Sequence, residues 1–199
     1  MPPKHLTLAI LLLALTAHSG DSTITYGGKV YKTAKIGTQT WLAENLNYEA
    51  KGSVCYDNNP ANCAKYGRLY NWETAMKVCP KGWHLPNNAE WEKLFRYIDG
   101  DTGFGNPYES PSAGKHLKAA SGWNEDGNGT DKYGFSALPG GGCNPSGNFD
   151  FIGYFGSWWS TTEGNANGAY SCGMLFIGRY TNMNYSNKSS LFSIRCVKD

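Results

Sequence analysis

The 199-residue sequence predicts an α+β fold with antiparallel sheets. Short alternating segments come first, two helical patterns follow, and short strand patterns separated by Gly/Asn/Ser loops fill the region after residue 135. With 25 glycines and 14% aromatic residues, the fold should be rich in loops, and aromatic rings should make up much of the buried core. Neither an internal repeat nor a linker divides the chain, so residues 20–199 are predicted to form one domain.

The N-terminal elements are predicted from alternation and from turn residues. Residues 23–36 alternate in part and contain Gly27-Gly28, which indicates a hairpin. Residues 38–46 are typical of another short strand. Apolar residues at helical spacing then predict a first helix over 70–78, which Pro80 should end.

The strongest local pattern is the start of a second helix over 88–98. Asn87 is placed to cap it, and Glu90, three residues later, is placed to return the bond in a capping box. One apolar face follows at helical spacing, formed by Trp91, Leu94, Phe95 and Ile98. The sequence therefore predicts a short amphipathic helix that packs on the core.

The rest of the chain is more irregular. Residues 100–112 are predicted to be a loop, and residues 113–120 a third short helix. Residues 180–187 are rich in Tyr, Asn and Ser and are predicted to be a loop with the composition of an adaptable binding surface. Four strands are predicted in the second half, at 135–138, 154–160, 168–180 and 191–197.

The first residues are typical of an export signal. Lys4 precedes an apolar run over 6–17, which is short for a membrane span, and small residues predict cleavage after Ser19. The alternative is an uncleaved membrane anchor. We expect a secreted or cell-surface protein, with the periplasm as another location and no membrane insertion after cleavage.

Charge argues against some partners. Residues 1–19 contain one lysine and no acidic residue, so the remaining 17 basic and 16 acidic residues give a net charge of +1. This balance offers no electrostatic footprint for nucleic acid or for an anionic membrane.

Six cysteines in an exported chain predict disulfides rather than a metal site, because no Cys-x-x-Cys occurs. Six cysteines allow 15 pairings, and the sequence alone does not choose among them. Proximity favours Cys55–Cys63. For the other four we expect Cys79–Cys196 and Cys143–Cys172.

No catalytic constellation is visible. His84 has no positioned partner in the sequence and is expected to be a structural, hydrogen-bonded histidine. Asp126, Asn128 and Asp131 place oxygens at spacings that a hard cation favours, but a plain turn explains them more simply. No cofactor is therefore expected, with calcium as the open alternative.

Aromatic residues near the C-terminus are the best candidates for ligand binding. Trp158 and Trp159 are adjacent, so in a strand they should point to opposite faces, one toward the core and one more freely. The alternative is that most of these rings form the core. The candidate ligand-binding residues are Tyr154, Trp158, Trp159, Tyr170, Tyr180, Asn182, Asn184 and Tyr185.

Seven strings, in this order, resemble the Fibrobacter succinogenes major paralogous domain over residues 25–199. They are Lys35–Tyr48, Cys55–Asn58, Tyr66–Trp72, Gly82–Pro86, Tyr133–Gly141, Trp158–Glu163 and Ser193–Val197. That family is similar to the C-type lectin-like fold in its formylglycine-generating-enzyme-like branch. The resemblance implies an exported bacterial protein with two main helices on short antiparallel sheets. It also implies a bridge from a helix cysteine to the last strand, in agreement with Cys79–Cys196.

The resemblance does not imply a reaction. Formylglycine-generating enzymes bind copper with two closely spaced late cysteines, whereas Cys172 stands alone here. Calcium-dependent lectins use Glu-Pro-Asn or Gln-Pro-Asp with Trp-Asn-Asp, and none of these occurs. We therefore expect a non-enzymatic domain that binds polysaccharide or an extracellular protein. The alternatives are a structural element of an extracellular assembly and an oxidase of the formylglycine-generating type.

Overall fold

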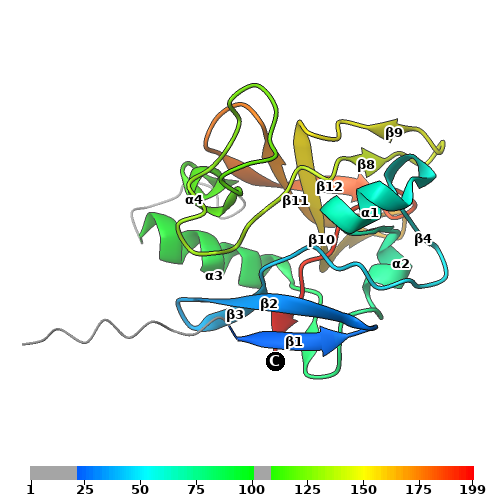
Figure 1. Ribbon diagram of the computed structural model, residues 1–199, viewed down its shortest axis with the longest axis horizontal. Coiled ribbons are helices and arrows are strands. Elements are labelled where there is room, and N and C mark those ends of the chain that lie inside the picture. Colours follow the sequence, from blue (N-terminus) through cyan, green and yellow to red (C-terminus); the bar gives the residue numbers. More distant parts are fainter. Residues whose placement is uncertain (1–21, 101–108) are drawn as a thin grey trace, which may run out of the picture.

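The computed structural model describes residues 22–100 and 109–199 as an α+β protein with two main antiparallel sheets (Figure 1). The predicted signal segment, residues 1–19, and most of the predicted loop over 100–112 lie outside the described residues. None of the helices in the described ranges is long and apolar enough to cross a membrane.

The first sheet has five strands in the order β1-β2-β3-β13-β6. Its strands are β1 (Thr23–Tyr26), β2 (Lys29–Ile36), β3 (Gln39–Leu42), β13 (Val197–Lys198) and β6 (Trp83–His84). The hairpin predicted around Gly27 is present, with Tyr26 opposite Lys29. The late strand β13 lies between β3 and β6, since Val197 pairs with both Trp41 and His84.

The second sheet has four strands in the order β10-β11-β12-β7. Its strands are β10 (Phe155–Asn165), β11 (Gly168–Leu175), β12 (Thr181–Asn187) and β7 (Glu109–Ser110). Two small pairs complete the strands: β4 (Ser53–Val54) with β5 (Leu69–Tyr70), and β8 (Gly142–Cys143) with β9 (Phe149–Asp150).

The helices are α1 (Pro60–Tyr66), α2 (Trp72–Ala75), α3 (Asn88–Asp99) and α4 (Ala113–Leu117), with a 3₁₀ turn at η1 (Tyr56–Asn58). The capping box predicted for α3 is present: the Asn87 side chain accepts from the Glu90 amide, and Glu90 accepts from the Asn87 amide. The main helix was therefore predicted to within a residue. The helix predicted over 70–78 shortens to α2.

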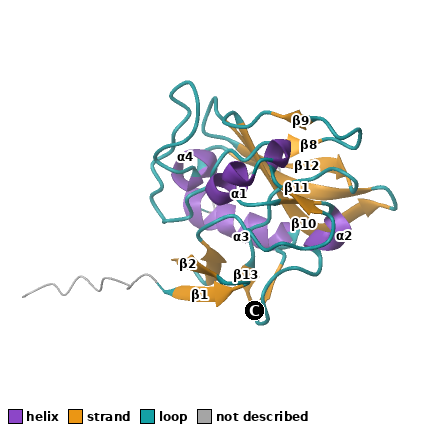
Figure 2. Cartoon of the chain, turned by 45° about the vertical axis from the view of Figure 1, so that its right-hand side comes forward, coloured by secondary structure: helices purple, strands orange, loops and turns teal. Residues whose placement is uncertain are grey.

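Two hydrophobic clusters lie on opposite faces of β10. One cluster joins α3, the strands β2 and β3, and the inner side of β10 and β11; Trp41, Trp91 and Trp158 are among its members. The other packs Trp159 with residues of β5, α2 and the C-terminal segment. In Figure 2 the helices α3 and α4 lie to one side of the strands β10–β12, and both supply residues to the first cluster. The prediction that aromatic rings fill the core is confirmed.

Several strand predictions are corrected by the structure. Of the residues 180–187 predicted to be a loop, 181–187 form β12, which pairs with β11 along its whole length. The segment 135–138 forms one isolated bridge, at Ala137, and no strand. In the segment 191–197 only Val197 belongs to a strand, while Leu191, Phe192 and Ser193 form isolated bridges.

Two disulfides are present, Cys55–Cys63 and Cys79–Cys196, as predicted. The predicted bridge Cys143–Cys172 is wrong: both cysteines are free and buried. Cys143 lies in β8 with its sulfur near the Asn144 carbonyl, whereas Cys172 lies in β11 with its sulfur 3.2 Å from the Thr181 hydroxyl. Burial raises the pKa of the Cys172 thiol to about 12, so this thiol stays protonated at neutral pH.

Candidate functional site

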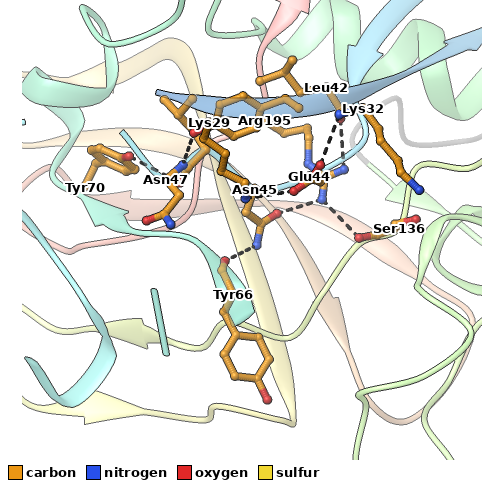
Figure 3. A network of polar contacts seen from close by, with 12 residues as sticks. Lys29, Lys32, Leu42, Glu44, Asn45, Asn47, Tyr66, Tyr70, Ser136 and Arg195 are labelled. Atoms are coloured by element: carbon orange, nitrogen blue, oxygen red, sulfur yellow. Dashed lines mark hydrogen bonds and ion pairs between the residues drawn. The ribbon is translucent and has the colours of Figure 1, made fainter. Parts of the chain in front are cut away.

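Residues from the recognisable sequence strings meet in one buried polar hub around Asn45 (Figure 3). The Asn45 amide oxygen accepts from the Trp158 indole N–H and from the Arg195 guanidinium, both at 2.8 Å. Its amide nitrogen donates to the Tyr66 carbonyl at 2.9 Å. One side chain thus joins four segments that are distant in the sequence.

Arg195 completes this hub. Its guanidinium is fully buried, donates to the Leu42, Phe135 and Ser136 carbonyls, and lies 4.4 Å from the centre of the Phe135 ring. Burial lowers the pKa of Arg195 to about 9, against the opposing charges of Asp131 and Glu44. Because Nη1 and Nη2 donate to backbone carbonyls and to the Asn45 side chain, the guanidinium joins these segments in the interior.

Both tryptophans of the predicted ligand set belong to the core, which corrects the prediction for them. Trp158 and Trp159 do point to opposite faces of β10, but both are 0% exposed because each face of the strand is covered by its own hydrophobic cluster. Their indole N–H groups donate to Asn45 and to the Tyr70 carbonyl. Neither ring is available to a ligand.

The strand β12 separates the remaining candidates. Side chains alternate along a strand, so Asn182 and Asn184 lie on one face of the sheet and Tyr185 lies on the other with its cross-strand partner Tyr170. The Tyr185 ring lies over Gly164 and Gly168, where a Cβ atom would overlap it, and it meets the Tyr170 ring edge-on at 6.2 Å. The predicted set is therefore not a single surface.

Asn182, Asn184 and Phe155 converge over Gly173, where a Cβ atom would collide with the Asn184 amide and approach the other two side chains. The two amides bond to each other, with 3.0 Å from the Asn182 nitrogen to the Asn184 oxygen. Asn182 is exposed, Asn184 and Phe155 are half-buried, and Leu175, opposite Phe155, is 51% exposed. We call Phe155, Leu175, Asn182 and Asn184 the amide–aromatic surface.

Exposed apolar side chains surround the same end of the sheet. Phe151, Ile177 and Tyr180 are 66%, 64% and 68% exposed. Phe151 also adopts a φ of +66°, which is unusual for a bulky residue. Tyr154 is half-buried and meets Phe176 edge-on at 5.2 Å.

Lys118 fixes the β11–β12 loop, which carries Ile177 and Tyr180. The sequence did not reveal this role. Its ammonium donates to the carbonyls of Leu175, Phe176 and Gly178, each at 3.1 Å, and lies 5.0 Å from the centre of the Trp123 ring. Burial lowers the pKa of Lys118. A single buried cation therefore holds the β11–β12 loop in shape.

The residues considered for calcium have other partners. The Asn128 side chain accepts from the Trp123 amide at 3.0 Å, and Asp131 accepts from the amide and the hydroxyl of Ser136 at 2.7 and 2.6 Å. Asp126 is exposed. Among the residues that the structure describes, no group of three His, Cys, Asp or Glu side chains is placed to hold a metal ion.

His84 is hydrogen-bonded on both ring nitrogens. Nδ1 lies 2.6 Å from an Asp199 oxygen and Nε2 lies 2.7 Å from a Glu90 oxygen. Partial burial alone would lower the pKa of His84, but the bonds and charges of the two carboxylates raise it overall. Neither nitrogen is free to accept a proton from a substrate.

The structure also contains a polar cavity of about 830 Å³ that the sequence did not predict. It lies beside the hub, between β2, the residues 64–67 that end α1, and the segment 131–138. Lysines line it from several elements, so no local motif announces it.

The fold and the hub define a disulfide-bonded α+β domain in which five of the distinctive strings meet in the interior. The chain belongs to the Fibrobacter succinogenes major domain family, whose model matches residues 34–198. Comparison with curated proteins and with solved structures finds no match for the chain.

Proposed function

We propose that this protein is an exported, non-enzymatic domain of the C-type lectin-like kind that binds polysaccharide through its amide–aromatic surface. The family, the α+β architecture and the two disulfides support this placement. The disulfides support an extracellular or periplasmic location, since such bonds persist in oxidising compartments.

The convergence of Asn182, Asn184 and Phe155 over Gly173 is the observation that carries the proposal. Paired amides supply donors and acceptors for sugar hydroxyls, and an aromatic face packs against the apolar side of a sugar ring. Gly173 leaves the space that lets the three side chains approach one another. The site is built on paired strands, which hold it more firmly than a loop would.

A protein partner is the second candidate, and the exposed apolar residues favour it. Phe151, Leu175, Ile177 and Tyr180 are each more than half exposed at one end of the sheet. Apolar side chains gathered on a surface mark interaction sites, and the unusual φ of Phe151 is of the kind that functional surfaces retain.

A glycan array and insoluble cellulose, each with and without calcium, test the proposal on residues 20–199. Asn182→Ala combined with Asn184→Ala should abolish binding, whereas Asn167→Ala, an exposed asparagine in the β10–β11 turn, should leave it unchanged. Binding that survives the double substitution would place the ligand elsewhere. A folded protein that binds no glycan would favour the protein partner.

A further inference from the structure

We infer that the lysine-lined cavity is a second binding site, for a ligand that carries two or more carboxylate or other oxyanion groups. It is separate from the amide–aromatic surface and needs no part of it. Its volume of about 830 Å³ is in the range of small-molecule sites in proteins.

The charge of the cavity differs from that of the whole chain. Its lining contains five lysines, Lys29, Lys32, Lys35, Lys65 and Lys198, against the two carboxylates of Glu44 and Asp131. The lining therefore carries a net charge of +3, whereas the entire chain carries +2. The buried Arg195 guanidinium adds a further positive charge behind the wall. Positive charge is thus concentrated in one hollow, which focuses the field there.

Both carboxylates have other partners, so within the described residues neither forms an ion pair with the remaining lysines. Glu44 accepts from the Lys29 ammonium at 2.9 Å and from the Lys32 backbone amide at 3.1 Å, as Figure 3 shows. Asp131 is bonded to Ser136 on both oxygens. Burial alone would raise the pKa of Glu44, but these bonds lower it overall, so Glu44 stays charged and keeps Lys29 occupied.

Four lysines remain, and one of them, Lys65, lies 4.7 Å from the centre of the Tyr66 ring, which leaves three to meet a ligand. Within residues 22–100 and 109–199, the ammonium groups of Lys32, Lys35 and Lys198 form no ion pair, and all three residues are exposed. Lys35 and Lys198 lie on one face of the first sheet and Lys32 lines the cavity from the other face of β2, so these separated cations match several negative groups spaced along a ligand better than a single anion. The hydroxyls of Thr40, Tyr133 and Ser136, which also line the cavity, suit a polar ligand frame such as an acidic sugar.

Isothermal titration calorimetry with trigalacturonate, citrate and sulfate tests the inference. The trimethyl ester of trigalacturonate has the same sugar frame without the charges and serves as the control ligand. Trigalacturonate should bind more tightly than its ester, and its affinity should fall as salt rises. The triple variant Lys32→Gln, Lys35→Gln, Lys198→Gln should weaken binding by about tenfold or more, since each exposed ion pair contributes modestly. The control Lys93→Gln, Lys115→Gln replaces exposed lysines outside the cavity and should change nothing.

The outcomes separate the sources of the anion. Binding of citrate but not of trigalacturonate, with the same loss in the triple variant, would support the site and assign it to a compact multivalent anion. Equal affinity for the acid and its ester, or equal affinity in the triple and control variants, would overturn the inference. So would a folded protein that binds none of the charged probes. Asn182→Ala with Asn184→Ala should leave this binding intact, so failure here and failure of the proposed function are distinguishable.

Discussion

The Asn45 side chain stabilises several segments of this protein at once. Its amide bonds Trp158, Arg195 and the Tyr66 carbonyl at the same time, in a site that is 4% exposed. Removal of the amide leaves an indole N–H, a guanidinium N–H and a carbonyl without their partner in the interior. Buried groups without a partner are more costly than an average hydrogen bond is favourable.

Asn45→Ala is therefore expected to lower the free energy of unfolding by about 3 kcal/mol. Urea denaturation followed by tryptophan fluorescence measures the change. Asn47→Ala serves as the control, because its backbone amide donates to the Tyr31 hydroxyl and its side chain has no hydrogen bond within the part of the chain that the structure describes. A loss of less than about 1 kcal/mol for Asn45→Ala would mean that water replaces the amide in the hub.

His84 predicts a pH dependence of stability. Its pKa is raised in the folded protein by Asp199 and Glu90, so the charged imidazolium stabilises the fold. This contribution is fully present below the pKa of the unfolded chain, near 6.5, and is lost as the pH rises through the higher pKa of the folded protein. Melting temperatures between pH 5.5 and 8.5 should fall across that window in the wild type. His84→Gln should remove this component, and an unchanged slope in the variant would assign it to another group.

At the scale of elements, Lys118 controls the β11–β12 loop. Lys118→Met keeps the length of the side chain but removes the ammonium that the carbonyls of Leu175, Phe176 and Gly178 share. Hydrogen exchange should therefore become faster in residues 176–180, while α3 keeps its protection. Equal protection of the loop in the variant and in the wild type would show that strand pairing alone holds it.

The two disulfides should differ in their effect on stability. Cys79–Cys196 spans 117 positions and Cys55–Cys63 spans 8. In the chain-entropy model, paired Cys→Ala substitutions should cost about 5 kcal/mol for the first and about 2.5 kcal/mol for the second. Chemical denaturation of the two double variants measures both values. A larger loss for the short bridge would mean that the entropy of the unfolded chain does not set the order.

The accuracy of the sequence predictions varies with how local each signal is. The capping box at Asn87 and Glu90 lies within four residues, and the predicted helix is present. Asn59 and Pro60 are an equally local start signal for α1, with Asn59 capping and Pro60 in the first turn, although α1 was not among the predicted helices. Strand β12 was missed because its polar residues resemble a loop, and only its pairing with β11 makes it a strand.

The candidate site was predicted only in part, because exposure is a property of the whole molecule. Alternation correctly puts Trp158 and Trp159 on opposite faces of β10, but a hydrophobic cluster covers each face. The lysines of the cavity come from β2, α1 and β13, so nothing in the local sequence joins them. Asn182 and Asn184 were named for their composition, and the space above Gly173 that brings them to Phe155 appears only in three dimensions.

At the scale of the molecule, the position of β13 has a consequence for how the chain matures. Val197 pairs with both β3 and β6, so the strand that closes the first sheet is synthesised long after the N-terminal hairpin. Until it arrives, the N-terminal hairpin and β6 have no shared neighbour, and the partner of Cys79 is also missing. Contacts between residues so far apart in sequence form slowly. A nascent chain therefore cannot complete the first sheet or its long disulfide until β13 and Cys196 have been synthesised.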